Sequence, residues 1–146
     1  QVQESFSGAV ATGTTVIPFD DTIPQSSEGD QYYSQSITPK NAGSDIEVEV
    51  YINQSHSTNT GQCVTALFLD SETDARAAVA TRIDSVAQPT QNIIRYKMSA
   101  GSTSAKTFKV RCGNSAAGTT TVNGSGAARR LGGVLISGIK ITEILA

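Results

Sequence analysis

Asp45-Ile-Glu-Val-Glu-Val-Tyr-Ile-Asn53 is the stretch that decides the fold, because apolar and polar side chains alternate along it. Successive side chains of a β-strand point to opposite faces, so every second residue lies on the same face. The apolar face consists of β-branched residues: Ile46, Val48, Val50 and Ile52. The opposite face carries Glu47, Glu49 and Tyr51. This pattern predicts a strand with one buried and one exposed face.

Several other short runs have the composition of strands, and turn-forming residues separate them. Residues 63–70 are apolar enough for a strand that is buried on both faces. Residues 71–85 carry alanines that favour a helix, but they also alternate, and we favour a strand. The remaining strands are expected at residues 14–18, 31–38, 92–98, 106–112, 118–124 and 130–145. About eight or nine strands without a convincing helix predict an all-β fold, an antiparallel jelly-roll β-sandwich.

The length of the chain suits one domain. Its 146 residues can bury one core but hardly two. We expect a polar lead-in segment over residues 1–12 and a single jelly-roll domain over residues 13–146. Because the chain begins at Gln1 and not at a Met, we also expect a fragment or a processed product of a longer protein.

Charge and hydropathy argue against two classes of partner. The net charge is −2 and the basic residues are spread along the chain, so no basic patch is expected to hold a phosphate backbone. No apolar run approaches the roughly 20 residues that a helix needs to cross a bilayer. We therefore expect no nucleic-acid partner and no membrane insertion.

Metal and cofactor chemistry has little support in the sequence. Four acidic residues offer oxygen ligands of the kind that calcium takes: Asp20, Asp21, Glu28 and Asp30. They lack the spacing of an EF-hand loop, and acidic residues in turns more often cap the backbone. We expect no metal ion and no cofactor.

Catalytic residues are equally sparse. His56 is the only histidine, and we expect it in a solvent-exposed loop without a nucleophile to activate. Cys63 and Cys112 match neither a metal-binding spacing nor a CxxC pair, so two buried free thiols are favoured over a disulfide. A glycan-cleaving site would need two carboxylates about 5–10 Å apart across a cleft. The sequence shows no such arrangement, and we expect no enzyme.

A series of motifs resembles one family. They are residues 13–25 (GTTVIPFDDTIPQ), 28–29 (EG), 37–40 (ITPK), 66–70 (ALFLD), 100–103 (AGST), 107–111 (TFKVR), 123–124 (NG), 130–133 (RLGG) and 137–143 (SGIKITE). In this order they resemble the C-terminal jelly-roll domains of bacteriophage tail fibres, tail spikes and head fibres, over nearly the whole chain. Cys63 and Cys112 depart from that pattern. The resemblance implies a homotrimer in the virion whose distal loops meet the host cell from outside.

The resemblance carries over no ligand, because members of that family do not share one target. Loops on a rigid sandwich carry most binding functions, and we expect exposed loops at residues 54–62, 99–105 and 115–119. Candidate ligand-binding residues are Tyr51, Ser55, His56, Asn59, Ser102 and Thr103. Candidate trimer-interface residues are Arg130, Gly132 and Gly133, because glycines in a closing strand allow a neighbouring backbone to approach.

These expectations combine into a non-catalytic virion module, a homotrimeric fibre or spike tip that binds a bacterial surface glycan or protein. The alternative is a purely structural role, as a trimerisation or capsid-decoration domain without a ligand. The expected partners are further copies of the chain and, in the first case, the host cell surface.

Overall fold

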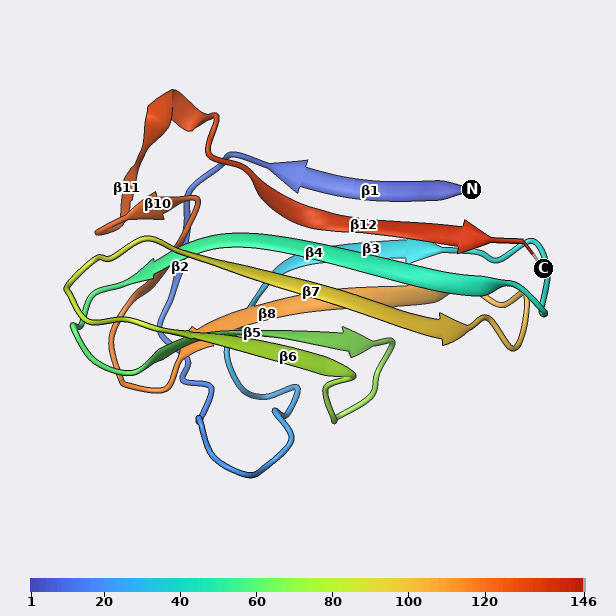
Figure 1. Ribbon diagram of the computed structural model, residues 1–146, viewed down its shortest axis with the longest axis horizontal. Coiled ribbons are helices and arrows are strands. Elements are labelled where there is room, and N and C mark those ends of the chain that lie inside the picture. Colours follow the sequence, from blue (N-terminus) through green and yellow to red (C-terminus); the bar gives the residue numbers. More distant parts are fainter. Residues whose placement is uncertain (146) are drawn as a thin grey trace.

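Two antiparallel β-sheets pack face to face in the computed structural model, which describes residues 1–145 (Figure 1). The main strands of the first sheet are, in spatial order, β7 (Thr90–Ser99), β4 (Asp45–His56), β12 (Ser137–Ile144) and β1 (Val2–Ser7). Beside the end of β4, this sheet continues with β9 (Thr120–Val122) and β2 (Ala11–Gly13). The second sheet has the order β3 (Asp30–Ile37), β8 (Lys106–Asn114), β5 (Gln62–Leu69) and β6 (Ala77–Arg82).

The chain crosses between the two sheets again and again, which makes the fold an all-β antiparallel jelly-roll sandwich, as the sequence predicts. A small hairpin of β10 (Gly124–Ser125) and β11 (Ala128–Arg129) leads into a 3₁₀ turn, η1 (Leu131–Gly133). Within residues 1–145 there are twelve strands, not eight or nine. Four strands had not been expected: β1 and β2 in the polar first segment, and the two-residue strands β10 and β11, which are too short to give a periodic signal.

The apolar core lies between the sheets, and β4 supplies its centre. The four apolar residues that define this strand in the sequence are at most 1% exposed. Opposite them, Leu67, Phe108 and Val110 of the second sheet are fully buried. The alternation at residues 45–53 therefore reports the inner and outer faces of the first sheet correctly.

One end of the core contains buried polar side chains, and most of their polar groups form hydrogen bonds. Asn92 Nδ2 donates to the carbonyl of Cys63 (2.9 Å) and lies 3.1 Å from Thr65 Oγ1, which Gln54 Nε2 also approaches at 3.2 Å. Cys63 and Cys112 are buried and free, as expected, and burial raises the pKa of Cys112 to about 12. Such thiols are unreactive, because the thiolate is the nucleophile.

Two sequence predictions about the first part of the chain are wrong. Residues 14–18 form no strand: Ile17 is buried, and its amide donates to the carbonyl of Asn114 (3.1 Å) within an irregular segment. Residues 1–12 are not a separate lead-in, because β1 pairs with β12 along its whole length and β2 pairs with β9. The polar composition of this segment hid its strands, since β1 lies at the edge of the sheet and buries little of its surface.

Several connecting loops lie at the two ends of the sandwich, whereas residues 14–29 form a long loop below the sheets in Figure 1. In Figure 1 residues 57–61, 83–89 and 115–119 are at the left end, whereas residues 38–44 and 100–105 are at the right end. A search of residues 1–145 found no helix of the length and apolarity that a membrane crossing requires.

Candidate binding surfaces

Residues 57–61, 83–89 and 115–119 meet at one end of the sandwich, which we call the loop end. The backbone amide of Ser57 donates to the carbonyl of Thr119 (3.0 Å), and the amide of Thr119 donates to Ser57 Oγ (2.8 Å). The amide of Ala87 donates to the carbonyl of His56 at 2.8 Å, which ties the β6–β7 loop to the end of β4. These bonds hold the three loops together before any ligand is present, so little conformational entropy is lost on binding.

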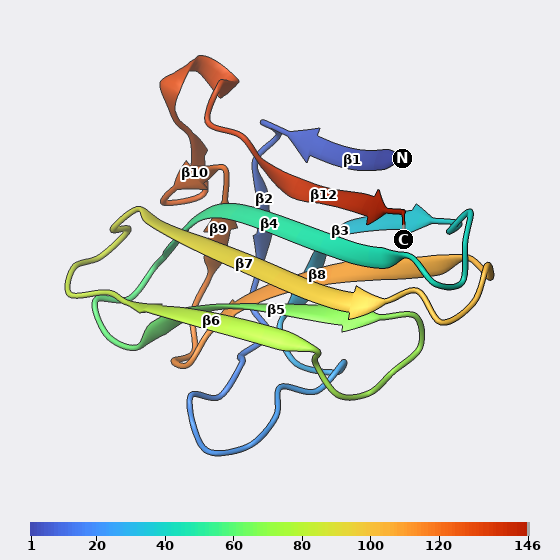
Figure 2. The same ribbon diagram turned by 45° about the vertical axis from the view of Figure 1, so that its right-hand side comes forward.

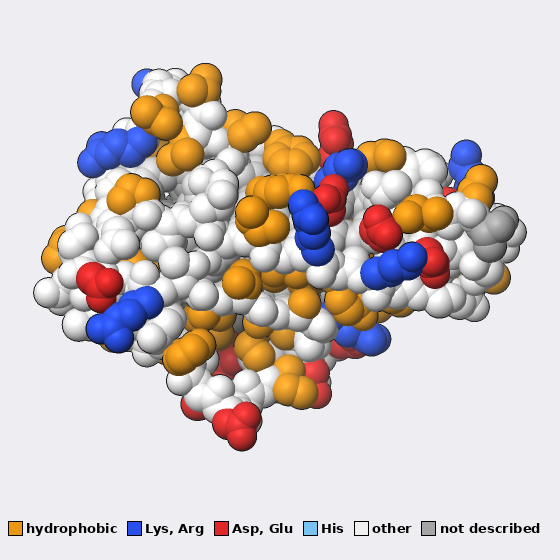
Figure 3. Space-filling model, in the orientation of Figure 1, with side chains coloured by type: hydrophobic (Ala, Val, Ile, Leu, Met, Phe, Trp, Pro, Cys, Tyr) orange, Lys and Arg blue, Asp and Glu red, His pale blue; other side chains and the backbone are white. Residues whose placement is uncertain are grey.

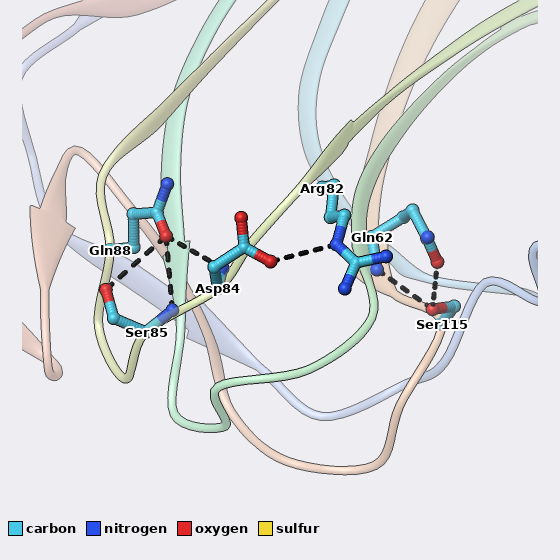
Figure 4. Close-up of polar contacts among 6 residues, drawn as sticks. All are labelled: Gln62, Arg82, Asp84, Ser85, Gln88 and Ser115. Carbon is cyan, nitrogen blue, oxygen red and sulfur yellow. Dashed lines mark hydrogen bonds and ion pairs between the residues drawn. The ribbon is translucent and has the colours of Figure 1, made fainter.

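Side chains at the loop end form two polar groups (Figure 4). In the first, Ser115 Oγ accepts from the amide of Gln62 and donates to Gln62 Oε1, both at 2.9 Å. In the second, Gln88 Oε1 accepts from the amides of Asp84 (2.8 Å) and Ser85 (3.2 Å) and closes the β6–β7 loop. These contacts explain the local shape of the loops.

The Arg82–Asp84 ion pair contributes much less to the stability of the fold than these contacts do. Arg82 Nε lies 2.9 Å from Asp84 Oδ1, but the side chains are 76% and 71% exposed. An ion pair this exposed contributes little to stability, because water and salt screen it. The two planar groups remain open to a ligand, and Val86 of the same loop, which is 62% exposed, adds an apolar side chain to this end. This combination can hydrogen-bond a hydroxyl-rich ligand and contact its apolar face.

The structure places two candidate ligand residues in the interior. Ser55 and His56 were expected in an exposed loop, but β4 continues through both, and they are 0% and 2% exposed. This expectation is wrong because β4 gains a second partner, β9, which pairs with residues 54–56. Burial lowers the pKa of His56, and its Nδ1 lies 2.8 Å from Thr58 Oγ1.

The other four candidate ligand residues lie on three different surfaces. Asn59 is exposed in the loop end, as expected. Ser102 and Thr103 lie in the β7–β8 loop at the opposite end of the sandwich, beside the turn before β4. Tyr51 lies on the outer face of β4, where its hydroxyl donates to Glu49 Oε1 at 3.2 Å. The six residues therefore do not form one site.

The outer face of the first sheet carries a row of apolar side chains across four strands. Residues paired in register across these strands are Phe6, Gly138, Tyr51 and Ile93. A Cβ added to Gly138 would lie 2.5 Å from Phe6 Cδ1, so the Phe6 ring covers the glycine. Phe6 and Ile93 are 41% and 44% exposed, and Figure 3 shows hydrophobic side chains gathered over the middle of this face. The alternation along residues 45–53 predicted that this face is exposed, but it did not predict that the face is apolar.

Charged residues predominate in the next two rows of this face. The first contains Glu4, Lys140, Glu49 and Arg95, and the second contains Val2, Thr142, Glu47 and Lys97. Lys140 lies 3.4 Å from Glu49, and Lys97 lies 2.9 Å from Asp45. Glu4 forms no ion pair within residues 1–145.

The candidate trimer-interface residues Arg130, Gly132 and Gly133 lie in a segment that projects from the sandwich, above β10 in Figure 2. Two large apolar side chains project there, Leu131 at 71% and Val134 at 78% exposure. Their role as interface residues stays a prediction.

Asn53 and Asn123, the asparagines of two Asn-X-Ser sequences, and the acidic turn residue Asp20 make structural hydrogen bonds. Asn123 is 1% exposed, and its Nδ2 lies 2.8 Å from the carbonyl of Ser7 and 3.0 Å from that of Ala9. Asn53 Nδ2 donates to the carbonyl of Ile136 at 2.6 Å. Asp20 Oδ1 caps its turn through the amide of Thr22 at 2.9 Å. Across residues 1–145, His, Cys, Asp and Glu side chains form no group of three or more that would hold a metal ion.

Comparisons with known proteins identify a fold and no family. No family model matches the chain, and no curated protein matches it. Eiger TNF from S. frugiperda matches with a TM-score of 0.52 and 14% identity, over 99% of this chain and 92% of that chain. The C-terminal domain of EclA, a sugar-binding protein, matches with a TM-score of 0.44 and 12% identity over 92% and 77% of the two chains.

A third similar structure is the CBM36-1 domain of a multidomain xylanase from the hindgut metagenome of Trinervitermes trinervoides. Its TM-score is 0.43 at 10% identity, and the match covers 98% of this chain and 99% of that domain. The match to Eiger TNF, at 14% identity and a TM-score of 0.52, shows a shared fold alone. The class defined by the topology is an all-β jelly-roll domain.

Proposed function

We propose that this domain is a non-catalytic bacteriophage virion module, a homotrimeric fibre or spike tip that binds a bacterial surface glycan or protein through the loop end. The observation that carries the proposal is the Arg82–Asp84 pair: its planar groups are exposed where β6 ends and the pre-ordered β6–β7 loop begins, and the fold hardly depends on them. Binding residues on rigid scaffolds commonly have this character. The phage assignment comes from the sequence motifs that resemble the family.

A glycan is the first ligand to test. Arginine and aspartate present paired donors and paired acceptors, which match neighbouring hydroxyl groups of a sugar ring. A catalytic role is not proposed, because the exposed carboxylate of Asp84 is held by Arg82 and has no second carboxylate as its partner at the loop end.

Glycan-array binding of the whole chain, with arrays of purified bacterial capsular and lipopolysaccharide glycans, tests the proposal. We expect the double variant Arg82→Ala, Asp84→Ala to lose at least about tenfold in affinity, since two charge-assisted hydrogen-bonding groups disappear. The matched control is Ser102→Ala, Thr103→Ala at the opposite end, which should bind as the unmodified protein does. Equal binding by the loop-end variant would place the ligand elsewhere.

The alternative, a purely structural trimerisation or capsid-decoration domain, is favoured by a different observation. The outer face of the first sheet exposes Phe6 and Ile93 in a single chain, and such a face is suited to contact with other copies. Absence of binding to every glycan and to intact cells, together with a stable homotrimer, would support this alternative.

A further inference from the structure

The two edges of the first sheet carry complementary side chains on the outer face. At the β1 edge the outer face presents Phe6 and Glu4, and at the β7 edge it presents Ile93 and Arg95. Glu4 has no ion pair inside the described part of the chain. The Arg95 side chain is 77% exposed and lies 3.9 Å from Glu49, so it keeps donors for another acceptor. One edge is therefore apolar and anionic, and the other is apolar and cationic.

These edge residues also lie at matching heights along the strands. Phe6 and Ile93 belong to one row of the register, because Phe6 pairs with Gly138, Gly138 with Tyr51, and Tyr51 with Ile93. Glu4 and Arg95 belong to the next row, linked in the same way through Lys140 and Glu49. Rotation about an axis parallel to the strands leaves the height of every residue unchanged. Such a rotation brings the β1 edge of one copy to the β7 edge of another in the correct row.

We infer that the outer face of the first sheet is the contact between copies, with β1 of one copy against β7 of the next. In this contact Phe6 packs on Ile93, Glu4 pairs with Arg95 across the interface, and Tyr51 faces the symmetry axis. The inference rests on the proposed homotrimer and adds the surface and the pairing that build it. A contact between two different patches closes into a ring when the rotation closes, as in a trimer.

The charges disfavour contacts between identical edges. Two β1 edges would bring Glu4 against Glu4, and two β7 edges would bring Arg95 against Arg95. Like charges in contact across an interface are repulsive and select against that arrangement. The distribution of charge therefore specifies opposite edges.

Cross-linking through introduced cysteines tests the contact. In the double variant Glu4→Cys, Arg95→Cys, the two positions of one chain are separated by three strand spacings, about 14 Å. A bismaleimide reagent with a shorter reach can therefore join them only between chains. The natural thiols, Cys63 and Cys112, are 0% exposed and do not compete. The single variants Glu4→Cys and Arg95→Cys are the controls.

We expect the double variant to give a covalent trimer in denaturing gels and each single variant to stay monomeric. Cross-linked dimers of a single variant would show identical edges in contact and overturn the inference. An uncross-linked double variant that is still trimeric by native mass spectrometry would overturn the contact but leave the homotrimer standing. A covalent dimer with two links would support the β1–β7 contact and overturn the trimer. A protein that is monomeric by native mass spectrometry would overturn both the contact and the trimer.

Charge reversal gives an independent test that needs no cross-linking reagent. Glu4→Arg and Arg95→Glu should each raise the dissociation constant of the trimer at least about tenfold, because the same contact is repeated around the ring. The double variant restores the opposite charges and should return to within a few-fold of the unmodified protein. Asp21→Arg, an equal charge change in the exposed turn after Pro18, should have no effect. Failure of the double variant to recover would contradict the pairing.

Discussion

At the scale of single residues, His56 shows how composition misled the sequence interpretation. A histidine among serines, threonines and asparagines has the composition of a loop, yet it ends a twelve-residue strand and is 2% exposed. Gly118 packs against it: a Cβ added there would lie 2.6 Å from His56 Cε1. The buried ring is consequently a structural element of the loop end.

This environment makes stability depend on pH. Burial lowers the pKa of His56 below its ordinary value of 6.5, and the backbone of Gly118 offsets only part of this. Below pH 6.5 the unfolded chain therefore binds the proton more readily than the folded protein does, and the free energy of unfolding should decrease as the pH falls from 6.5 towards the folded pKa.

Urea unfolding at pH 7.5, 6.5 and 5.5 measures this effect. The unmodified protein should lose stability between the last two values, and His56→Gln should show a smaller change over the same interval. Equal slopes for the two proteins would mean that His56 is accessible to protons in the folded state.

At the scale of elements, the sequence predicted the long strands because their patterns are local. The alternation at residues 45–53 locates β4, and the apolar run at residues 63–70 locates β5. Extension of β4 to residue 56 could not be predicted, because it depends on pairing with β9, which lies far along the chain. The polar residue Gln54 faces inward there and bonds to Thr65, and periodicity has no means to distinguish a satisfied buried amide from an exposed one.

The edge strand β1 depends on one glycine. A Cβ at Gly138 would lie 2.3 Å from the carbonyl oxygen of Ser5 and would also meet the Phe6 ring. Gly138→Ala should therefore push β1 away from β12 and lower the free energy of unfolding by about 2 kcal/mol, the usual cost of overpacking.

Thermal or urea unfolding of Gly138→Ala measures that cost, and Thr142→Ala is the matched control. Thr142 lies on the same strand and the same outer face but is only partly buried. A neutral effect of Gly138→Ala would mean that β1 does not pair with β12 in the observed register.

At the scale of the whole molecule, the candidate site could be predicted only in part. Two of the three expected loops, residues 57–61 and 115–119, do meet at the loop end. Residues 100–105 lie at the other end. They connect β7 to β8, and both strands run along the sandwich from this loop to the loop end. Arg82 and Asp84 had no sequence signal, since they lie in the alanine-rich stretch that was ambiguous between helix and strand. The end at which a loop lies follows from strand order and direction, which no single stretch encodes.

The separation of the loop end from the outer face of the first sheet leads to a prediction about avidity. Loops 57–61 and 83–89 lie at the end of the strands, whereas Phe6 and Ile93 lie along one face of the sheet. If the trimer forms through that face, three loop ends point the same way, since an axis parallel to the strands keeps them at one height. Three linked sites bind a repetitive surface far more tightly than one, because the second and third contacts are intramolecular.

Ile93→Asp should therefore convert the trimer to a monomer and reduce binding to intact bacterial cells about a hundredfold, without altering affinity for a soluble monovalent fragment of the same surface glycan. Ile23→Asp, at an isoleucine that is 55% exposed in the acidic turn, is the matched control and should change neither quantity. Flow cytometry with labelled protein gives the cell binding, and calorimetry with the fragment gives the affinity of one site. Reduced fragment affinity in Ile93→Asp would mean that the sheet face and the loop end are coupled or that the ligand binds on the face itself.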